Sequence, residues 1–413
     1  MGEGITENSS TSTVISYIVL FGTLGIVLLN LLSVVFPALL VSTFGSHAEF
    51  LSPFEIGYQG VPLIIINIAL FGLGILYYKK RNSSFHNGIN KIRSFEISKK
   101  VALISAIIIL GIYVGVTAPE LGMDEAEQYP DFEILQMGLE IWPSTESDDI
   151  YVREQNDRVV RMFLLDISND VLQNVKILPF VASIILVIFT YLLTHQITQK
   201  RFAGIISMVV LLQSFTFLKY DTIAVYENFW VLFYVISLYL IYKKWWILSA
   251  PAYILSVFTK AFVAPYLLMN IFFAYRANIT RKQKILLLIS YIVALGIVLG
   301  LFSSQDAIYG DVVRIDFERF AMAFGHFSAQ IRFDYLLLFT ILPMTVGLFF
   351  ISKSGIKHAD SILVLFFGTL LAGPLVALLT DHYVILPYRF VPLIVFFAIA
   401  VGLIFARRIN QSV

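Results

Sequence analysis

Cysteine is absent from this chain, and charged residues are scarce. Because none of the 413 residues carries a thiol, disulfides, thiolate metal sites and thiol nucleophiles are all excluded. Charged residues make up 14% of the chain, whereas soluble domains contain about 25%. The 29 lysine and arginine residues nearly balance the 28 aspartate and glutamate residues. No overall positive field therefore favours binding to nucleic acid.

Apolar residues take the place of the missing charges. They account for 58% of the chain, and the mean hydropathy is +0.82. This composition excludes a soluble globular protein, and it equally excludes a disordered one. The sequence therefore predicts an all-α polytopic protein of the cell membrane, in contact with membrane lipids.

Apolar runs predict the membrane-spanning helices. The hydrocarbon core of a bilayer is about 30 Å thick and needs about 20 apolar residues per helix. The first run is expected to be an uncleaved helix, since it is too long for a signal peptide and has no basic region before it. We expect about twelve spans, at 15–43, 61–78, 101–117, 177–194, 203–218, 229–242, 247–258, 261–275, 285–303, 333–352, 361–379 and 388–406.

The distribution of basic residues predicts which side each loop faces. If both termini are cytoplasmic, the inner loops and the C-terminal tail hold 19 of the 29 lysine and arginine residues, as the positive-inside rule requires. Of the 28 carboxylates, 24 fall on the opposite side. The polar residues of the outer face are therefore the first place to look for function.

The outer loop at 118–176 carries fourteen carboxylates and is the longest polar stretch. Its 155–173 stretch predicts an amphipathic helix at the membrane surface. Asp124 and Glu125 follow the third predicted span closely enough to lie near the interface. A carboxylate there is suited to deprotonate a hydroxyl or to hold a metal ion. The alternative is a solvated acidic cap at a helix end.

Other outer positions carry isolated polar residues. Lys260, in an outer turn between two apolar segments, is suited to bind a lipid-linked phosphate, although a lysine that snorkels to the interface is equally ordinary. Arg389, at the start of the last span, fits a phosphate or a plain helix-end anchor. Further candidates for substrate binding are Asp221, Glu227, Arg332 and His382.

Motifs of other enzyme classes are missing. The chain has no phosphate-binding glycine loop, no histidine pair at metal-binding helical spacing and no nucleophile elbow. These absences argue against a soluble type of active site that uses nucleotides.

From about residue 118 to 402 the chain resembles the GT-C glycosyltransferases, which include protein O-mannosyltransferases, bacterial aminoarabinose transferases and dolichol-pathway mannosyltransferases. Five short segments occur in the family's order, each on the expected side. They are Met123-Asp-Glu-Ala-Glu-Gln-Tyr129, Lys176-Ile-Leu-Pro179 with the basic turn at 194–202, Glu227-Asn-Phe229, Leu255-Ser-Val-Phe-Thr-Lys260 and Tyr388-Arg-Phe-Val-Pro392.

The resemblance implies transfer of a sugar from a dolichyl or undecaprenyl phosphate donor to an acceptor hydroxyl on the outer face. Asp124 would be the general base, and Glu125 would assist by hydrogen bonding, positioning or metal contact. Lys260 and Arg389 would bind the lipid phosphate. No cofactor is certain, but a divalent metal held by Asp124, Glu125 and Glu227 is possible.

The chain departs from the family's pattern at its N-terminal end. The acidic loop normally follows the first helix, but here it follows the third. Residues 1–100 therefore read as an added transmembrane hairpin with a basic inner loop, and residues 101–413 as the GT-C-like module. The Trp-Trp-Asp motif of oligosaccharyltransferases is absent.

Two other classes stay open. A transporter or lipid flippase places ionisable residues near the midplane of its helices, whereas the charges here cluster at one face. A non-catalytic scaffold would use the large loop only to dock a partner. The sequence identifies neither the sugar nor the acceptor.

Overall fold

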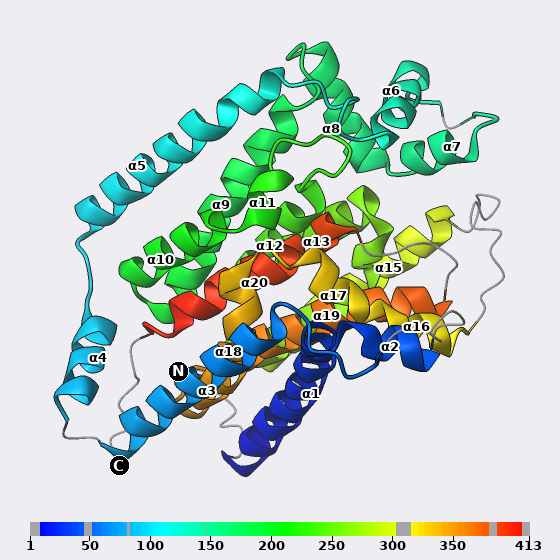
Figure 1. The fold of residues 1–413 in the computed structure, drawn as a ribbon. Coiled ribbons are helices and arrows are strands. Elements are labelled where there is room, and N and C mark those ends of the chain that lie inside the picture. The colour runs from blue at the N-terminus through cyan, green and yellow to red at the C-terminus, as the bar shows by residue number, and fades with distance from the viewer. Residues whose placement is uncertain are drawn as a thin grey trace.

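The structure is a computed structural model that describes residues 9–44, 52–80, 83–144, 146–302, 315–379 and 386–406. Every regular element in these ranges is a helix, so the all-α prediction is confirmed for them (Figure 1). The elements run α1 Ser9–Val35, α2 Pro37–Phe44, α3 Gly60–Lys79, α4 Ser84–Ser94, α5 Lys99–Thr117, η2 Ala118–Gly122, α6 Asp131–Ile141, α7 Ile150–Asn156, α8 Val159–Asp170, α9 Ile177–Thr198, α10 Arg201–Leu212, α11 Phe215–Lys219, α12 Phe229–Tyr242, α13 Trp246–Thr259, η3 Ala261–Tyr266, α14 Leu267–Arg276, α15 Arg281–Phe302, α16 Phe317–Ala323, α17 Gly325–Gln330, α18 Tyr335–Lys353, α19 His358–Leu379, η4 Pro387–Phe390 and α20 Val391–Leu403.

Helix length limits how many of these elements can cross a membrane. Each predicted apolar run coincides with one or two helices. In the described ranges six helices are long and apolar enough to span a bilayer, namely α1, α3, α5, α9, α18 and α19. Several others are shorter. The 12 residues of α10, for example, extend only about 18 Å at 1.5 Å per residue. The structure thus supports a membrane protein, while the number of twelve spans stays a prediction.

Helix α20 lies at the centre of the bundle. Almost all of its residues are buried, and it packs against α9, α10, α18 and α19. Gly402 marks the closest approach, because a Cβ atom at this position would lie 2.3 Å from Cγ2 of Thr194 on α9 and 3.0 Å from the carbonyl oxygen of Ala203 on α10. Small residues let helices pack closely in this way.

Helix α1 belongs to the same bundle. It packs along α18 and α19, and near its start the hydroxyl of Ser16 donates to Oδ2 of Asp360 at 2.7 Å. Arg276, at the end of α14, donates to the same carboxylate oxygen. The buried pair Arg276–Asp360 thus ties three helix ends together. The division at residue 100 stays a prediction.

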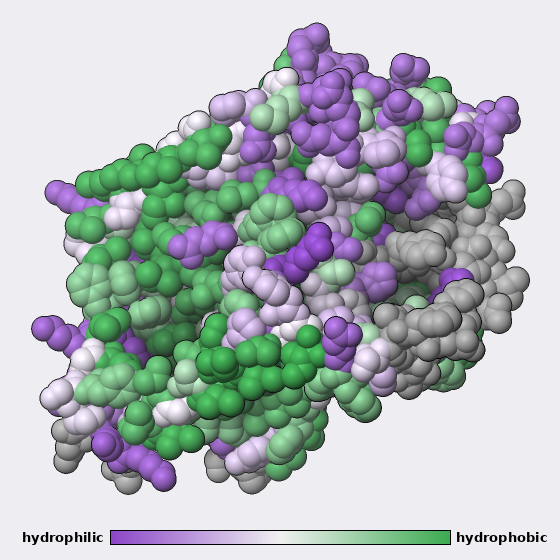
Figure 2. Space-filling model, in the orientation of Figure 1, coloured by the Kyte–Doolittle hydropathy of each residue, from purple (hydrophilic) through white to green (hydrophobic). Residues whose placement is uncertain are grey.

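The polar elements gather at the opposite end. Figure 2 shows hydrophilic residues densely over α6, α7 and α8, whereas hydrophobic residues cover α5 and the neighbouring flank of the bundle. Helix α5 runs along the edge of the molecule beside α10 (Figure 1), and most of its side chains are exposed. At its end, η2 leads directly into the acidic segment that begins at Met123.

Candidate functional site

The acidic turn, defined here as residues 123–127, follows η2 at the polar end. The Asp124 side chain is exposed, and its Oδ1 accepts a hydrogen bond from the backbone N–H of Ala126 at 2.9 Å. Lys176, at the start of α9, donates from Nζ to the carbonyl oxygens of Glu120 and Met123. This lysine fixes the backbone just before Asp124, so the carboxylate is presented to solvent from an anchored turn.

Glu125 faces inward instead. Its side chain is 2% exposed. Its two carboxylate oxygens accept hydrogen bonds from the backbone N–H groups of Ala224 at 3.0 Å and Val225 at 2.8 Å. Burial raises the pKa of Glu125, and these two hydrogen bonds act against that shift. Glu125 therefore holds the acidic turn against the segment 220–228, called the bridging loop below.

Arg161 secures the bridging loop from the other side. This residue of α8 is 1% exposed, and its Nε lies 2.8 Å from Oε2 of Glu227. Its Nη2 also donates to the carbonyl oxygens of Ala224 and Val225, at 3.3 and 3.0 Å. The expectation of a surface helix over 155–173 is therefore wrong at this residue, because its charge is neutralised inside the protein. Glu227 is committed to the same pair.

Four tyrosines extend from the bridging loop toward the last helix, and we call them the tyrosine cluster: Tyr129, Tyr220, Tyr226 and Tyr388. Tyr226 stacks on Tyr388 with ring centroids 4.6 Å apart, and its hydroxyl donates to Oδ2 of Asp131 at 2.8 Å. The cluster therefore links the acidic loop to η4.

Lys260 lies on the far face of the tyrosine cluster. Its Nζ is 3.9 Å from the ring centroid of Tyr388 and 5.8 Å from that of Trp230, and the residue is 6% exposed. Among the described residues, no carboxylate forms an ion pair with this ammonium. Burial lowers the pKa of Lys260 to about 8. Arg158 and Arg389 lower its pKa further, and Tyr388 and Glu227 act against them. A buried ammonium that lies over aromatic rings is suited to receive an anion.

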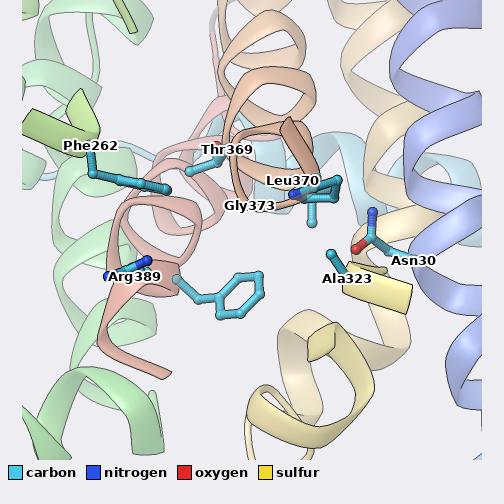
Figure 3. Close-up of a pocket in the computed structure, with 9 residues that line it drawn as sticks. Asn30, Phe262, Ala323, Thr369, Leu370, Gly373 and Arg389 are labelled. Atoms are coloured by element: carbon cyan, nitrogen blue, oxygen red, sulfur yellow. The ribbon is translucent and has the colours of Figure 1, made fainter. Parts of the chain in front are cut away.

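Arg389 follows Tyr388 in η4. Its Cζ lies 5.3 Å from the ring centroid of Phe262, two residues beyond Lys260. The side chain lines a small pocket with residues of α1, α16 and α19 (Figure 3). The two predicted phosphate-binding cations thus lie close together, Lys260 directly before η3 and Arg389 in η4.

Asp221 is placed differently from expectation. It belongs to the bridging loop, has no exposed surface, and its carboxylate points into the interior near the buried Tyr113. Burial raises its pKa to about 8, which keeps the group protonated at neutral pH. The structure therefore gives Asp221 an interior position and no access to a substrate.

Two other candidates are not brought into this arrangement. Arg332 is exposed. Its guanidinium lies over Phe333, and its carbonyl oxygen accepts a hydrogen bond from Gln59. Within the described ranges, none of its contacts involves Lys260 or Arg389. His382 lies outside the described residues.

The predicted metal ligands do not form a ligand set. Both oxygens of Glu125 receive backbone N–H groups, and Glu227 pairs with Arg161. Over the described part of the chain, no group of three histidine, aspartate or glutamate side chains is arranged to hold a metal ion. We therefore assign no step to a metal.

Comparison with protein-family models, with curated proteins and with solved structures found no match to this chain.

Proposed function

We propose that this protein is an integral-membrane glycosyltransferase of the GT-C type. It would take a sugar from a polyprenyl phosphate and transfer it to an acceptor hydroxyl on the outer face, with both termini in the cytoplasm. The membrane-embedded helical bundle is compatible with a lipid-linked donor. The sugar and the acceptor are left open.

The observation that carries the proposal is the double attachment of the bridging loop. On one side its backbone binds Glu125, the neighbour of the exposed Asp124. On the other side Tyr226 stacks on Tyr388, and the ammonium of Lys260 lies over the ring of Tyr388. A carboxylate able to accept a proton and a buried cation able to bind phosphate are therefore held on one connected framework.

This framework suits a single displacement at the anomeric carbon. Asp124 would accept the proton of the acceptor hydroxyl while the oxygen of that hydroxyl forms a bond to the anomeric carbon. The bond from that carbon to the phosphate oxygen would break, and the lipid phosphate would leave with its electron pair. Lys260 and Arg389 would stabilise the charge that develops on this phosphate. Glu125 acts as a positioning residue.

The test is transfer from a panel of labelled polyprenyl-phosphate sugars by the purified, full-length protein. We expect Asp124→Asn to lower the transfer rate by about 10²–10⁴-fold, the usual contribution of a general base, with unchanged expression and melting temperature. Glu127→Gln is the matched control, because Glu127 is an exposed carboxylate of the same turn. It should transfer at the wild-type rate.

Two results would contradict the proposal. Sugar transfer by Asp124→Asn at the wild-type rate would show that Asp124 is not the general base. Movement of a labelled lipid across a vesicle membrane, without sugar transfer from any donor, would instead support the flippase alternative.

A further inference from the structure

Helix α4 (Ser84–Ser94) connects α3 and α5, two helices that are long and apolar enough to span a bilayer. Figure 1 shows α4 at the edge of the molecule, between the ends of these two helices and far from α6, α7 and α8. Because α3 ends and α5 begins beside it, α4 lies at the level of one membrane surface. With both termini in the cytoplasm, as proposed above, this is the cytoplasmic surface.

The side of α4 that faces the protein is held by hydrogen bonds. The hydroxyl of Tyr77 on α3 donates to Oδ1 of Asn90 at 2.8 Å. Nε of Arg93 donates to the carbonyl oxygen of Ile404, just after α20, at 2.9 Å. Nζ of Lys200, between α9 and α10, donates to the carbonyl oxygen of Arg93. Three parts of the bundle therefore fix which side of α4 faces outward.

The outward side of α4 is apolar along one flank and polar along the other. Phe85 and Ile92 lie two turns apart on the same flank, and Phe95 directly follows the helix. These three residues, called the apolar flank below, are 41%, 59% and 50% exposed. Asn87 and Lys91, one turn apart, are exposed on the other flank. An exposed apolar strip beside a polar one is typical of a helix that lies in a membrane surface.

Positive charge surrounds the apolar flank and has few counter-ions. Glu96 is the only carboxylate between positions 79 and 100, and it pairs with Arg201 at 3.9 Å. Five lysines of α4 and of the adjoining helix ends are exposed, and none of them forms an ion pair with another described residue: Lys79, Lys80, Lys91, Lys99 and Lys100. Lysines at this level match the negative surface of a leaflet that contains anionic lipids.

We propose that α4 is a binding site for anionic phospholipids of this leaflet. The apolar flank enters the acyl-chain region, and the surrounding lysines bind the headgroup phosphates. The helices on either side, α3 and α5, have mostly exposed side chains, so lipid is the medium next to the flank. The proposal concerns the surrounding membrane, and it does not rest on sugar transfer.

The absence of cysteine from the chain allows a direct test, since a single introduced cysteine can carry a fluorescent probe. Ile92→Cys places the probe on the apolar flank, and Asn87→Cys, on the polar flank of the same helix, is the matched control. The full-length protein is reconstituted in bilayers of phosphatidylcholine and phosphatidylglycerol. A nitroxide on the acyl chain should quench the probe at position 92 several-fold more strongly than the probe at position 87. Acrylamide in the aqueous phase should give the reverse order.

The probe at position 92 also reports headgroup selectivity. Nitroxide-labelled phosphatidylglycerol should quench it more strongly than nitroxide-labelled phosphatidylcholine at the same fraction, and high salt should reduce this preference. Adding Lys91→Gln should lower the preference by up to about fivefold, the contribution of one lysine near an anionic surface. Lys282→Gln is the control, because Lys282 is an exposed lysine at the start of α15, on the same predicted side. It should leave the preference unchanged.

Three results would overturn the proposal. Equal quenching by acrylamide at positions 92 and 87 would place the apolar flank in water, as a surface that docks another protein. Equal quenching by the two labelled lipids would exclude selective binding of anionic headgroups. The same loss of preference in Lys91→Gln and Lys282→Gln would assign the selectivity to the overall charge of this side of the protein.

Discussion

Two buried charge clusters occupy opposite ends of this bundle, and they differ in whether each positive charge is paired with a carboxylate. At the end where α1 begins, Arg276 and Asp360 are 1% and 0% exposed in their side chains and pair with each other. At the polar end, Arg161 and Glu227 form a similar pair, but Lys260 lies nearby at 6% exposure with no carboxylate paired to it among the described residues.

The difference separates structural charge from charge available for binding. A buried cation that already has its counter-ion holds helices together. A buried cation that lies over aromatic rings, with no ion-paired carboxylate among the described residues, keeps most of its desolvation cost. A ligand with the opposite charge lowers that cost. On this reasoning the first cluster stabilises the fold, and the second favours an anion.

The largest effect on stability should come from breaking the balanced pair. Asp360→Leu leaves the guanidinium of Arg276 buried without its carboxylate, which costs about 3–5 kcal/mol. Thermal unfolding of the purified protein should show a clearly lower midpoint. The double variant Arg276→Leu/Asp360→Leu should recover most of the loss. If Asp360→Leu alone were as stable as the wild type, the Arg276–Asp360 pair would not stabilise the fold, and the two charge clusters would not differ in this respect.

A smaller and more local effect is expected at Glu125. Glu125→Gln leaves one acceptor oxygen for two backbone N–H groups, and a hydrogen bond to a charged group contributes about 1.5–3 kcal/mol. Amide hydrogen exchange should become faster at Ala224 and Val225, while exchange in α12 stays unchanged. The substitution Glu127→Gln, at an exposed carboxylate of the same turn, should leave amide hydrogen exchange unchanged at Ala224, at Val225 and in α12. Equal protection in the Glu125 variant would show that this carboxylate does not hold the bridging loop.

The smallest loss of stability is expected at Lys260. Its folded pKa is about 8, below the ordinary 10.5, so the unfolded chain binds more protons between these values and wild-type stability rises with pH across this window. Lys260→Met removes the buried charge. We expect the unfolding midpoint of this variant at pH 7 to be no lower than that of the wild type. The difference in stability between the two proteins should become smaller as the pH rises from about 8 to 10.5.

Lys260→Met should nevertheless weaken binding of decaprenyl phosphate strongly. Arg332→Met, an exchange of an exposed cation, should leave binding unchanged. A Lys260 variant that is destabilised at pH 7, and that still binds the lipid, would place Lys260 with the structural charges.

Much of the fold follows from the sequence, because apolar runs in a membrane protein must become helices. The runs at 61–78 and 101–117 coincide with α3 and α5. The number of spans is harder to predict. Hydropathy does not show where an apolar run is divided into two helices, as between α10 and α11. It also does not distinguish a short helix, such as the 12 residues of α10, from a longer one of equal hydropathy.

The site was predictable only in part. The segment around Asp124 and the turn at Lys260 stand out in the sequence, since isolated charges beside apolar runs are costly. Arg161 did not stand out, because a basic residue in an acidic loop looks solvated. Its burial depends on Glu227, 66 positions away. Asp221 was misplaced for a similar reason, since only the folded chain shows that the loop covers its carboxylate.

Helix α5 has a consequence for the lipid environment in which the protein works. Its 19 residues extend about 28 Å, close to the thickness of the hydrocarbon core, and its side chains are mostly exposed. A thinner or thicker bilayer changes the tilt of such a helix. Because the acidic turn follows the C-terminal end of α5 through η2, hydrophobic matching along α5 would set the height of Asp124 relative to the membrane surface.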